Sequence, residues 1–351
     1  MKALVLKADR QLVYVTDRSI PEGPGENCTL VRVAACGICG SDLPRGFGAK
    51  AYHYPLVMGH EFSAVVEETR HGSRFHSGDR VAVFPLIPCG KCGLCQTGDY
   101  AQCVDYDYFG SRRDGAFEEY LRVPESNLFP VPKEVNLLHA SQTEPAAVAL
   151  HGIRKLHIRA GDAAVVYGAG PIGNLSAQWL RLHGCAEIFV VDIDERKLAI
   201  AAQMGFVPIN SKKMDPVRAV LDRTNGAGAD RSVEACGLPI TFLQAVQSAA
   251  RFGEVLFMGN INGTFQIGEK DFSNILRKEL AIYGTWNSKV TPMGADDWTT
   301  VLRFMDRGLQ IAPLITDRLS LEEGPAIFDD IVQRRGFHNK VVFDLAPEVT
   351  R

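Results

Sequence analysis

The stretch "AAVVYGAGPIGNLSAQWLRLHG", residues 163–184, decides the fold of the second half of the chain. An apolar run leads into the pattern GxGxxG and then into helical text, which predicts a strand, a glycine turn and a helix. Asp192 closes the next apolar run, "IFVVD", about 20 residues further on. In this context the glycines predict a dinucleotide-binding βαβ unit.

The loop residues that we expect at the dinucleotide are Gly168, Gly170, Ile172 and Gly173. The glycines permit a tight turn, close approach of the pyrophosphate and packing of helix on strand, and the helix N-terminus attracts phosphate. Asp192 should accept hydrogen bonds from the adenosine ribose and repel a 2′-phosphate, which favours NAD over NADP. Lys197 is a nearby cation that softens this repulsion. The alternative is a plain glycine turn, with Asp192 as a helix cap.

The rest of the chain predicts two domains of different character. Before residue 140, short Val-rich runs such as "LVRVAACG" and "DRVAVFP" alternate with Gly, Pro and Asp, which predicts a β-rich, barrel-like domain. From about residue 145, strands alternate with helices, which predicts an open, mostly parallel α/β sheet. After a helix at residues 296–308, the segment ending in "NKVVFDL" should rejoin the first domain. We therefore expect the division 1–145, 146–288 and 289–351.

The composition of the chain narrows the classes of molecule that the protein is expected to bind. The chain has 38 basic and 41 acidic residues, a formal net charge of −3, and no basic stripe of the kind that binds nucleic acid. No 18 apolar residues run together, and the first apolar segment is too short for a secretory signal. We expect a cytoplasmic protein, away from membranes, that acts on a small molecule. In a reducing compartment, clustered cysteines are more often metal ligands or catalytic thiols than disulfides.

The stretch "CGKCGLCQTGDYAQC", residues 89–103, holds four of the nine cysteines: Cys89, Cys92, Cys95 and Cys103. Four thiolates at this spacing favour a closed, structural zinc site, which leaves no position for a substrate. A CxxC redox pair is disfavoured because Gly90, Gly93 and Gly98 make a helix here improbable. An iron–sulfur cluster remains an alternative, since it also takes four thiolates.

A second set of metal-ligand residues is dispersed along the chain. "ACGICGSD" contains Cys36 and Cys39, "GHEF" contains His60 and Glu61, and "TEPAAVALHG" contains Glu144. One thiolate, one imidazole and a carboxylate leave the fourth zinc position open, as a catalytic site requires. Each residue alone is equally consistent with packing or an ordinary polar pair. Their occurrence beside a dinucleotide site and a four-cysteine stretch favours the metal.

These motifs, with "GDRVAV", "DGAFEEYLRVP" and "RKELAIYGTW", resemble the zinc-containing medium-chain dehydrogenase/reductase family over essentially the whole chain. The resemblance implies a GroES-like catalytic domain, a Rossmann NAD-binding domain and a C-terminal return to the catalytic domain. It also implies one catalytic and one structural Zn²⁺ per chain, NAD as the cofactor, and a homodimer or homotetramer.

The resemblance further implies roles for single residues. Cys39 and His60 match the catalytic zinc ligands, and Glu61 and Glu144 match carboxylates that bind the metal directly or through water; Cys36 should pack. Ser41 matches the hydroxyl that takes the substrate proton. Asp42 should orient His60, as metal-bound imidazoles usually require. Many relatives have a relay histidine where this chain has Pro44-Arg45, which leaves the end of the proton path to water or the cofactor ribose.

Within the family, "GSDLPR", "YDYFGSRRDGAFEEY" and "ILRKELAIYGTW" resemble the polyol dehydrogenases. This implies oxidation of a secondary hydroxyl of a polyol phosphate to a ketose phosphate, most specifically galactitol 1-phosphate to tagatose 6-phosphate. Arg45, Arg112 and Arg113 are candidates for the phosphate, since guanidinium suits bidentate recognition, although "GSRRDG" also fits a solvated turn.

Three alternatives remain for the function. A dehydrogenase of a free polyol and an L-threonine 3-dehydrogenase would use the same metal and cofactor sites. A non-catalytic NAD-binding protein would lack catalytic ligands, whereas the residues expected at the metal are all present here.

Overall fold

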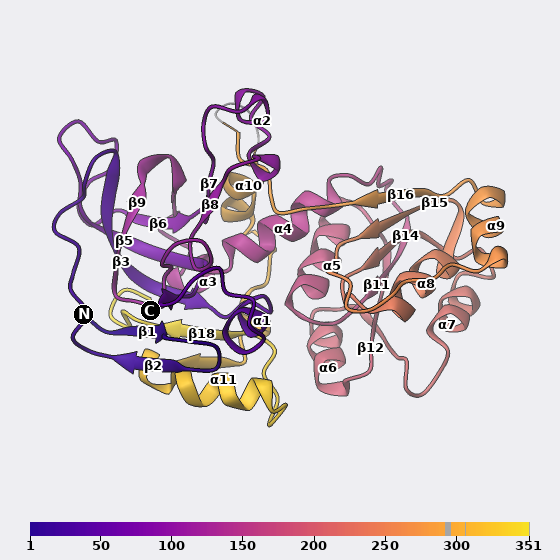
Figure 1. Cartoon of the computed structure of the whole chain (residues 1–351). Coiled ribbons are helices and arrows are strands. Elements are labelled where there is room, and N and C mark those ends of the chain that lie inside the picture. The colour runs from indigo at the N-terminus through magenta and orange to yellow at the C-terminus, as the bar shows by residue number, and fades with distance from the viewer. Residues whose placement is uncertain (292–295, 306, 351) are drawn as a thin grey trace. The chain divides into compact units, whose positions relative to one another are not determined.

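The computed structural model describes residues 1–291, 296–305 and 307–350, and the chain divides into two compact units (Figure 1). The first unit contains Met1–Glu144, Lys289–Arg307 and Ile315–Arg351, and the second contains Pro145–Ser288 and Gly308–Leu314. The return of residues 308–314 to the second unit was not part of the expected division. Asp306, inside the helix expected at 296–308, lies outside the described residues.

The first unit is built on a seven-stranded sheet in the order β10-β6-β5-β3-β18-β17, with β9 also paired to β3. Smaller sheets are formed by β2-β1-β4 and by β7-β8. The strands are β1 (Ala3–Leu6), β2 (Leu12–Val15), β3 (Cys28–Gly37), β4 (Leu56–Val57), β5 (Glu61–Glu68), β6 (Arg80–Val83), β7 (Leu86–Ile87), β8 (Asp107–Tyr108), β9 (Tyr120–Pro124), β10 (Leu128–Pro130), β17 (Asp317–Leu319) and β18 (Val341–Asp344). Since β18 pairs with β3, the C-terminal segment completes this sheet.

The helices of the first unit are short. They are α1 (Asp42–Phe47), α2 (Gly93–Gln96), α3 (Leu137–Ala140), α10 (Asp297–Phe304) and α11 (Gly324–Val332). Helix α4 (Thr143–Ile153) begins at the end of this segment and belongs mostly to the second unit. Single 3-10 turns occur at Tyr100–Gln102, Glu125–Asn127 and Leu321–Glu323. A helical turn at α2 was not expected among the glycines of residues 89–103.

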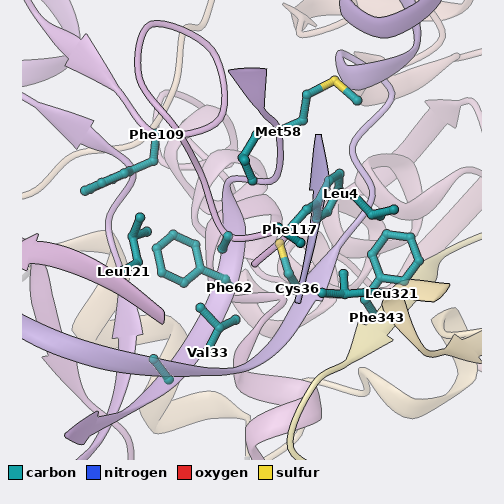
Figure 2. Packing of buried hydrophobic residues seen from close by; sticks show 14 of the residues in the cluster. Leu4, Val33, Cys36, Met58, Phe62, Phe109, Phe117, Leu121, Leu321 and Phe343 are labelled. Carbon is teal, nitrogen blue, oxygen red and sulfur yellow. The ribbon is translucent and has the colours of Figure 1, made fainter. Parts of the chain in front are cut away.

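The core of the first unit fixes the strands that carry the site. Figure 2 shows part of this cluster, including Phe62 of β5, Phe117 and Phe343 of β18. The rings of Phe117 and Phe343 meet edge to face at 5.1 Å between centroids, a favourable aromatic geometry. Cys36 is fully buried in the same cluster, so its side chain packs. The ends of β3, β5 and β18 are therefore held together by their own apolar side chains.

The second unit is a six-stranded parallel sheet in the order β13-β12-β11-β14-β15-β16. This order, in which the chain reverses direction between β11 and β14, is that of a doubly wound Rossmann fold. Its strands are β11 (Ala163–Tyr167), β12 (Glu187–Asp192), β13 (Val207–Asn210), β14 (Ala229–Glu234), β15 (Ala249–Phe257) and β16 (Ala281–Gly284). Its helices are α5 (Pro171–His183), α6 (Glu195–Gln203), α7 (Pro216–Arg223), α8 (Pro239–Ser248) and α9 (Glu269–Arg277), with a 3-10 turn at Ala312–Leu314.

The predicted strand, turn and helix are β11, residues 168–170 and α5. Proline at the first helical position needs no backbone N–H there, and Gly184 ends the helix in the left-handed conformation (φ 116°). Among the described residues, no helix has both the length and the apolarity needed to cross a membrane.

Candidate active site and metal centres

Three neighbouring strand ends assemble the first group of polar residues. β3 runs antiparallel to β5 and β18, so its carboxyl end at Gly37 lies beside Glu61, the first residue of β5, and Val342 of β18. Cys39 follows β3 by two residues, and Lys340 directly precedes β18. A Cβ at Gly37 would collide with the Glu61 carboxylate. Glycine at this position therefore gives the carboxylate its room.

Cys39, His60 and Glu61 form one compact donor set. Their ligand atoms all lie within 4.8 Å of one another, and His60 and Glu61 are buried. Burial alone would lower the pKa of His60, but the thiolate of Cys39 and the carboxylate of Asp42 outweigh it and hold the pKa well above its usual value. The set thus places a thiol group and a carboxyl group around a buried imidazole. A divalent cation with N, O and S ligands fits this chemistry.

Lys340 is a member of this site that the sequence patterns did not reveal. It is 4% exposed, its Nζ contacts Glu61 Oε2, and it donates a hydrogen bond to the carbonyl oxygen of Ile38 at 2.9 Å. Burial would lower the pKa of Lys340, but Glu61 and Cys39 raise it above its usual value. The ammonium therefore stays charged and offsets part of the buried negative charge.

Asp42 lies between His60 and Arg45. Its Oδ1 is 3.6 Å from His60 Nδ1 and accepts a hydrogen bond from Arg45 Nη1 at 2.7 Å, and its Oδ2 accepts one from the backbone N–H of Cys39 at 2.9 Å. Burial opposes ionisation of Asp42, but His60 and Arg45 outweigh it and lower the pKa. The guanidinium of Arg45, three residues further along α1, is therefore already paired with the Asp42 carboxylate.

Ser41 and Glu144 lie at the edges of the donor set. The exposed Ser41 hydroxyl donates to Cys39 Sγ at 3.3 Å. Glu144 is buried, and burial raises its pKa to about 7. It does not belong to the donor set of Cys39, His60 and Glu61. Its Oε1 accepts a hydrogen bond from the hydroxyl of Tyr108 at 3.3 Å. The ring of Tyr108 meets that of His60 edge to face at 5.7 Å.

The three candidate arginines have different surroundings. Arg113 forms an ion pair with Asp107 at 2.9 Å, and Arg45 is held by Asp42. Arg112 has no carboxylate partner within the part of the chain that the structure describes. Its guanidinium lies between two rings, 4.1 Å from the centre of Tyr106 and 5.3 Å from that of Tyr52, and donates once to the Tyr106 carbonyl oxygen.

The four cysteines of residues 89–103 converge on one point. Their Sγ atoms lie within 4.8 Å of one another, with 3.5 Å between Cys92 and Cys95 and 3.9 Å from Cys92 to Cys103 and from Cys89 to Cys95. Sulfurs bound to one zinc ion at about 2.3 Å are separated by roughly 3.8 Å in a tetrahedron. Backbone N–H groups of Val104 and Cys95 lower the pKa of Cys92 to about 6, which favours the thiolate.

The spacing of the four sulfurs favours one of the chemistries considered for residues 89–103, here called the lobe. Disulfide sulfurs are about 2.05 Å apart, and all nine cysteines are free thiols. A cubane iron–sulfur cluster gives each thiolate its own iron and spreads the sulfurs further apart. A single tetrahedral ion fits best. The unexpected turn α2 brings Cys92 and Cys95 to the same side, with the N–H of Gln96 bonded to the Cys92 carbonyl oxygen.

The glycine loop leaves space for a dinucleotide. No atom lies within 4 Å of a Cβ built at Gly170, and Gly170 caps α5 without a side-chain hydrogen bond. A Cβ at Gly173 would collide with the carbonyl oxygen of Gly168, so helix and loop touch there. Ile172 lies in the first turn of α5. The free N–H groups at this helix start suit phosphate.

Asp192 binds the backbone as well as closing its strand. Its Oδ2 accepts from the N–H of Ala169 at 2.9 Å, and its Oδ1 accepts from Ile193 and Asp194 at 2.7 and 2.9 Å. The carboxylate therefore fixes the glycine loop to the end of β12. Asp192 is not the helix cap considered as an alternative. The N-cap of α6 is Asp194, whose side chain accepts a hydrogen bond from the N–H of Arg196. Lys197 lies in the first turn of the same helix, α6.

Comparison with known proteins agrees with this fold. Residues 25–133 match the alcohol dehydrogenase GroES-like domain, and residues 171–307 match the zinc-binding dehydrogenase domain. Galactitol 1-phosphate 5-dehydrogenase of Escherichia coli (strain K12) is 34% identical over 95% of this chain and 97% of its own length. L-threonine 3-dehydrogenase of Bacillus velezensis is 30% identical over 97% and 98%. The crystal structure of galactitol-1-phosphate dehydrogenase from Escherichia coli has a TM-score of 0.90 at 33% identity, covering 98% of this chain and 100% of that one.

A GroES-like unit with a cysteine, histidine and glutamate cluster, joined to a Rossmann unit, defines a zinc- and nicotinamide-dependent alcohol dehydrogenase. The chain belongs to the zinc-containing medium-chain dehydrogenase family. Its cofactors are zinc and NAD. When bound, zinc is a Lewis acid that lowers the pKa of a hydroxyl, and NAD accepts hydride.

Replacing a cysteine should have different effects on zinc content, stability and activity at the two proposed metal sites. Cys92→Ser should leave about one zinc per chain and lower Tm by roughly 10 °C, since a bound structural metal contributes directly to folding energy. Cys39→Ser should also leave about one zinc, but with near-normal Tm and no turnover. Metal analysis, thermal unfolding and activity measure this, with Cys28→Ser, a cysteine outside both sets, as the control. A Cys92→Ser enzyme that is inactive yet keeps both zinc ions and its Tm would contradict the division.

The carboxylate at the end of β12 predicts the choice of cofactor. The native enzyme should have a higher kcat/KM with NAD than with NADP, and Asp192→Asn should raise the NADP-to-NAD ratio by about tenfold, because one like-charge repulsion is lost. Asp194→Asn, two residues away, is the matched control and should leave the ratio unchanged. A native preference for NADP would refute the role given to Asp192.

Proposed function

We propose that the protein oxidises a secondary hydroxyl of a polyol phosphate to a ketose phosphate, with galactitol 1-phosphate to tagatose 6-phosphate as the specific reaction. The proposal rests on the surroundings of Arg112, because its guanidinium has no carboxylate partner among the described residues. Likeness over nearly the whole chain to a galactitol 1-phosphate 5-dehydrogenase supports it.

The arrangement around Arg112 suits a phosphate at one end of a polyol chain. Two tyrosine rings connect Arg112 to His60. The Arg112 guanidinium lies over the ring of Tyr106, whose centroid is 6.2 Å from that of Tyr108. The ring centroid of Tyr108 is in turn 5.7 Å from that of His60. A guanidinium stacked between rings keeps most of its N–H donors free for an anion. The reacting carbon would lie at the donor set and the phosphate at Arg112.

In this proposal Cys39, His60 and Glu61 hold the catalytic zinc, and Glu144, which accepts a hydrogen bond from Tyr108, is a further carboxylate that binds the metal directly or through water. Asp42 keeps His60 in place, and Lys340 balances the charge of Glu61. The exposed hydroxyl of Ser41, 3.3 Å from Cys39 Sγ, takes the substrate proton and passes it to solvent or the cofactor ribose. Cys89, Cys92, Cys95 and Cys103 hold the structural zinc.

L-threonine 3-dehydrogenase is the second candidate function, because enzymes of that name are also relatives over the full length. Its substrate carries a carboxylate, which Arg112 would also bind. A panel of galactitol 1-phosphate, galactitol, sorbitol and L-threonine with NAD separates the two. The proposal expects the highest kcat/KM with galactitol 1-phosphate, and equal values for phosphorylated and free polyols would overturn it.

Replacing the two adjacent arginines tests the phosphate site directly. Arg112→Leu should raise KM for galactitol 1-phosphate by roughly 10- to 100-fold, the range for loss of hydrogen bonds to a charged group, and leave turnover of free galactitol unchanged. Arg113→Leu is the matched control with a small effect, because Asp107 already pairs with that guanidinium. If Arg113→Leu had the larger effect on KM, the phosphate would have been assigned to the wrong residue.

We also propose that the enzyme forms a homodimer or homotetramer in solution. Strand β16 is an edge of the six-stranded sheet, and within the described residues it pairs only with β15. Its Ile282 and the nearby Trp286 are exposed apolar side chains. Open strand edges favour pairing with another chain, and a second copy satisfies both edges by symmetry.

Sedimentation of matched variants tests this assembly. Ile282→Lys should shift the enzyme towards the monomer, because a charge on the strand edge opposes pairing. Leu182→Lys, at a similarly exposed leucine on α5, should leave the assembly intact. A monomeric native enzyme at micromolar concentration would contradict the proposal.

A further inference from the structure

Glu234, the last residue of β14, is fully buried and holds the loop that follows it. Its Oε1 accepts hydrogen bonds from the backbone N–H groups of Cys236 and Gly237, both at 2.8 Å, and from the hydroxyl of Thr241 at 2.6 Å. Hydrogen bonds to a carboxylate are stronger than those between neutral groups. This one oxygen therefore ties residues 235–237 and the start of α8 to the end of β14.

The loop after β15 packs against the same carboxylate. The N–H groups of Met258 and Gly259 donate to the carbonyl oxygen of Glu234 at 2.9 and 3.1 Å, and that of Asn262 donates to Gly237 at 2.8 Å. A Cβ at Gly259 would lie 2.5 Å from Glu234 Oε2, so the two loops touch there. Glu234 is thus the point where the loops following β14 and β15 meet.

These loops lie at the place where the fold binds dinucleotides. In a doubly wound sheet, ligands bind at the carboxyl ends of the strands where the chain reverses direction, here between β11 and β14. The glycine loop follows β11, and residues 235–237 follow β14. The two are in contact: Ala235 N–H donates to Tyr167 at 2.9 Å, and Cys236 Sγ lies 2.9 Å from a Cβ built at Gly168.

We propose that Glu234 is a positioning residue for the dinucleotide, which fixes the loop opposite the glycine loop without touching the cofactor. Asp192 does the same for the glycine loop through the N–H of Ala169. Two carboxylates, one at the end of β12 and one at the end of β14, thereby hold the loops on both sides of the expected dinucleotide site. Loops with few apolar contacts open easily, and a carboxylate that gathers three donors keeps this one in a single conformation before the cofactor arrives.

The other buried carboxylate of this sheet provides a matched control. Glu254 of β15 lies in register with Ala281, the first residue of β16, and so at the opposite, amino-terminal edge of the strands. It also has several partners: the N–H and ring of His157, the hydroxyl of Tyr283 and the guanidinium of Arg231. Its loss should affect stability and leave the loops after β11 and β14 unchanged.

The test is the Kd for NADH, measured by fluorescence on the purified full-length protein, together with Tm. Glu234→Gln keeps the shape of the side chain but removes its charge, and should raise Kd about tenfold. Thr241→Val, which removes one of the three donors to Glu234, should raise Kd about threefold, within the range for loss of one hydrogen bond. Glu254→Gln should lower Tm with Kd within about twofold of the native value.

Each outcome decides the proposal. A native Kd in folded Glu234→Gln overturns it, and so does an equal rise in Kd for Glu234→Gln and Glu254→Gln, which would indicate general destabilisation. Should Glu234→Gln not fold, Thr241→Val decides: a raised Kd at native Tm supports the positioning role, and a native Kd overturns it. Because NADH is the only ligand, the result is independent of the polyol substrate.

Discussion

The contact between Lys340 and Glu61 is the constraint on which the active site depends. Both side chains are less than 5% exposed, and they lie beside Cys39 and His60. Buried charges are strongly unfavourable unless they are paired. The ammonium pairs with Glu61, and a metal ion held by the donor set would meet the rest of that requirement. The pair also joins β5 to β18, so charge balance at the site requires that the C-terminal strand complete the sheet.

Two metal environments within one unit serve different purposes. At residues 89–103 four thiol groups converge and leave no ligand position for a substrate, so this site can only stabilise its lobe. At the strand ends, three donors of different kinds converge, and the exposed hydroxyl of Ser41 lies 3.3 Å from one of them, Cys39 Sγ. The four cysteines come from one local stretch of chain, whereas Cys39, His60 and Glu61 are brought together only by the tertiary fold.

That difference explains what the sequence could predict. The glycine loop, Asp192 and the four cysteines are local patterns, and their spacing carries the chemistry directly. Lys340 and Glu61 are 279 positions apart and meet only through the register of β3 with β5 and β18. No pattern in a single sequence encodes that register. The ion pair of Arg45 with Asp42 joins residues three apart on a short helix and was therefore predictable in principle. The helical turn α2 was not, because its glycines disfavour a helix.

The two metals should have separable roles in the native enzyme. Timed removal of zinc with a chelator, followed by metal content, turnover and circular dichroism on the same samples, measures this directly. We expect two zinc ions per chain and two phases: the first ion leaves with turnover while the fold is retained, and the second leaves as the lobe unfolds. Loss of both ions in one phase, or full turnover after the first has gone, would contradict the account.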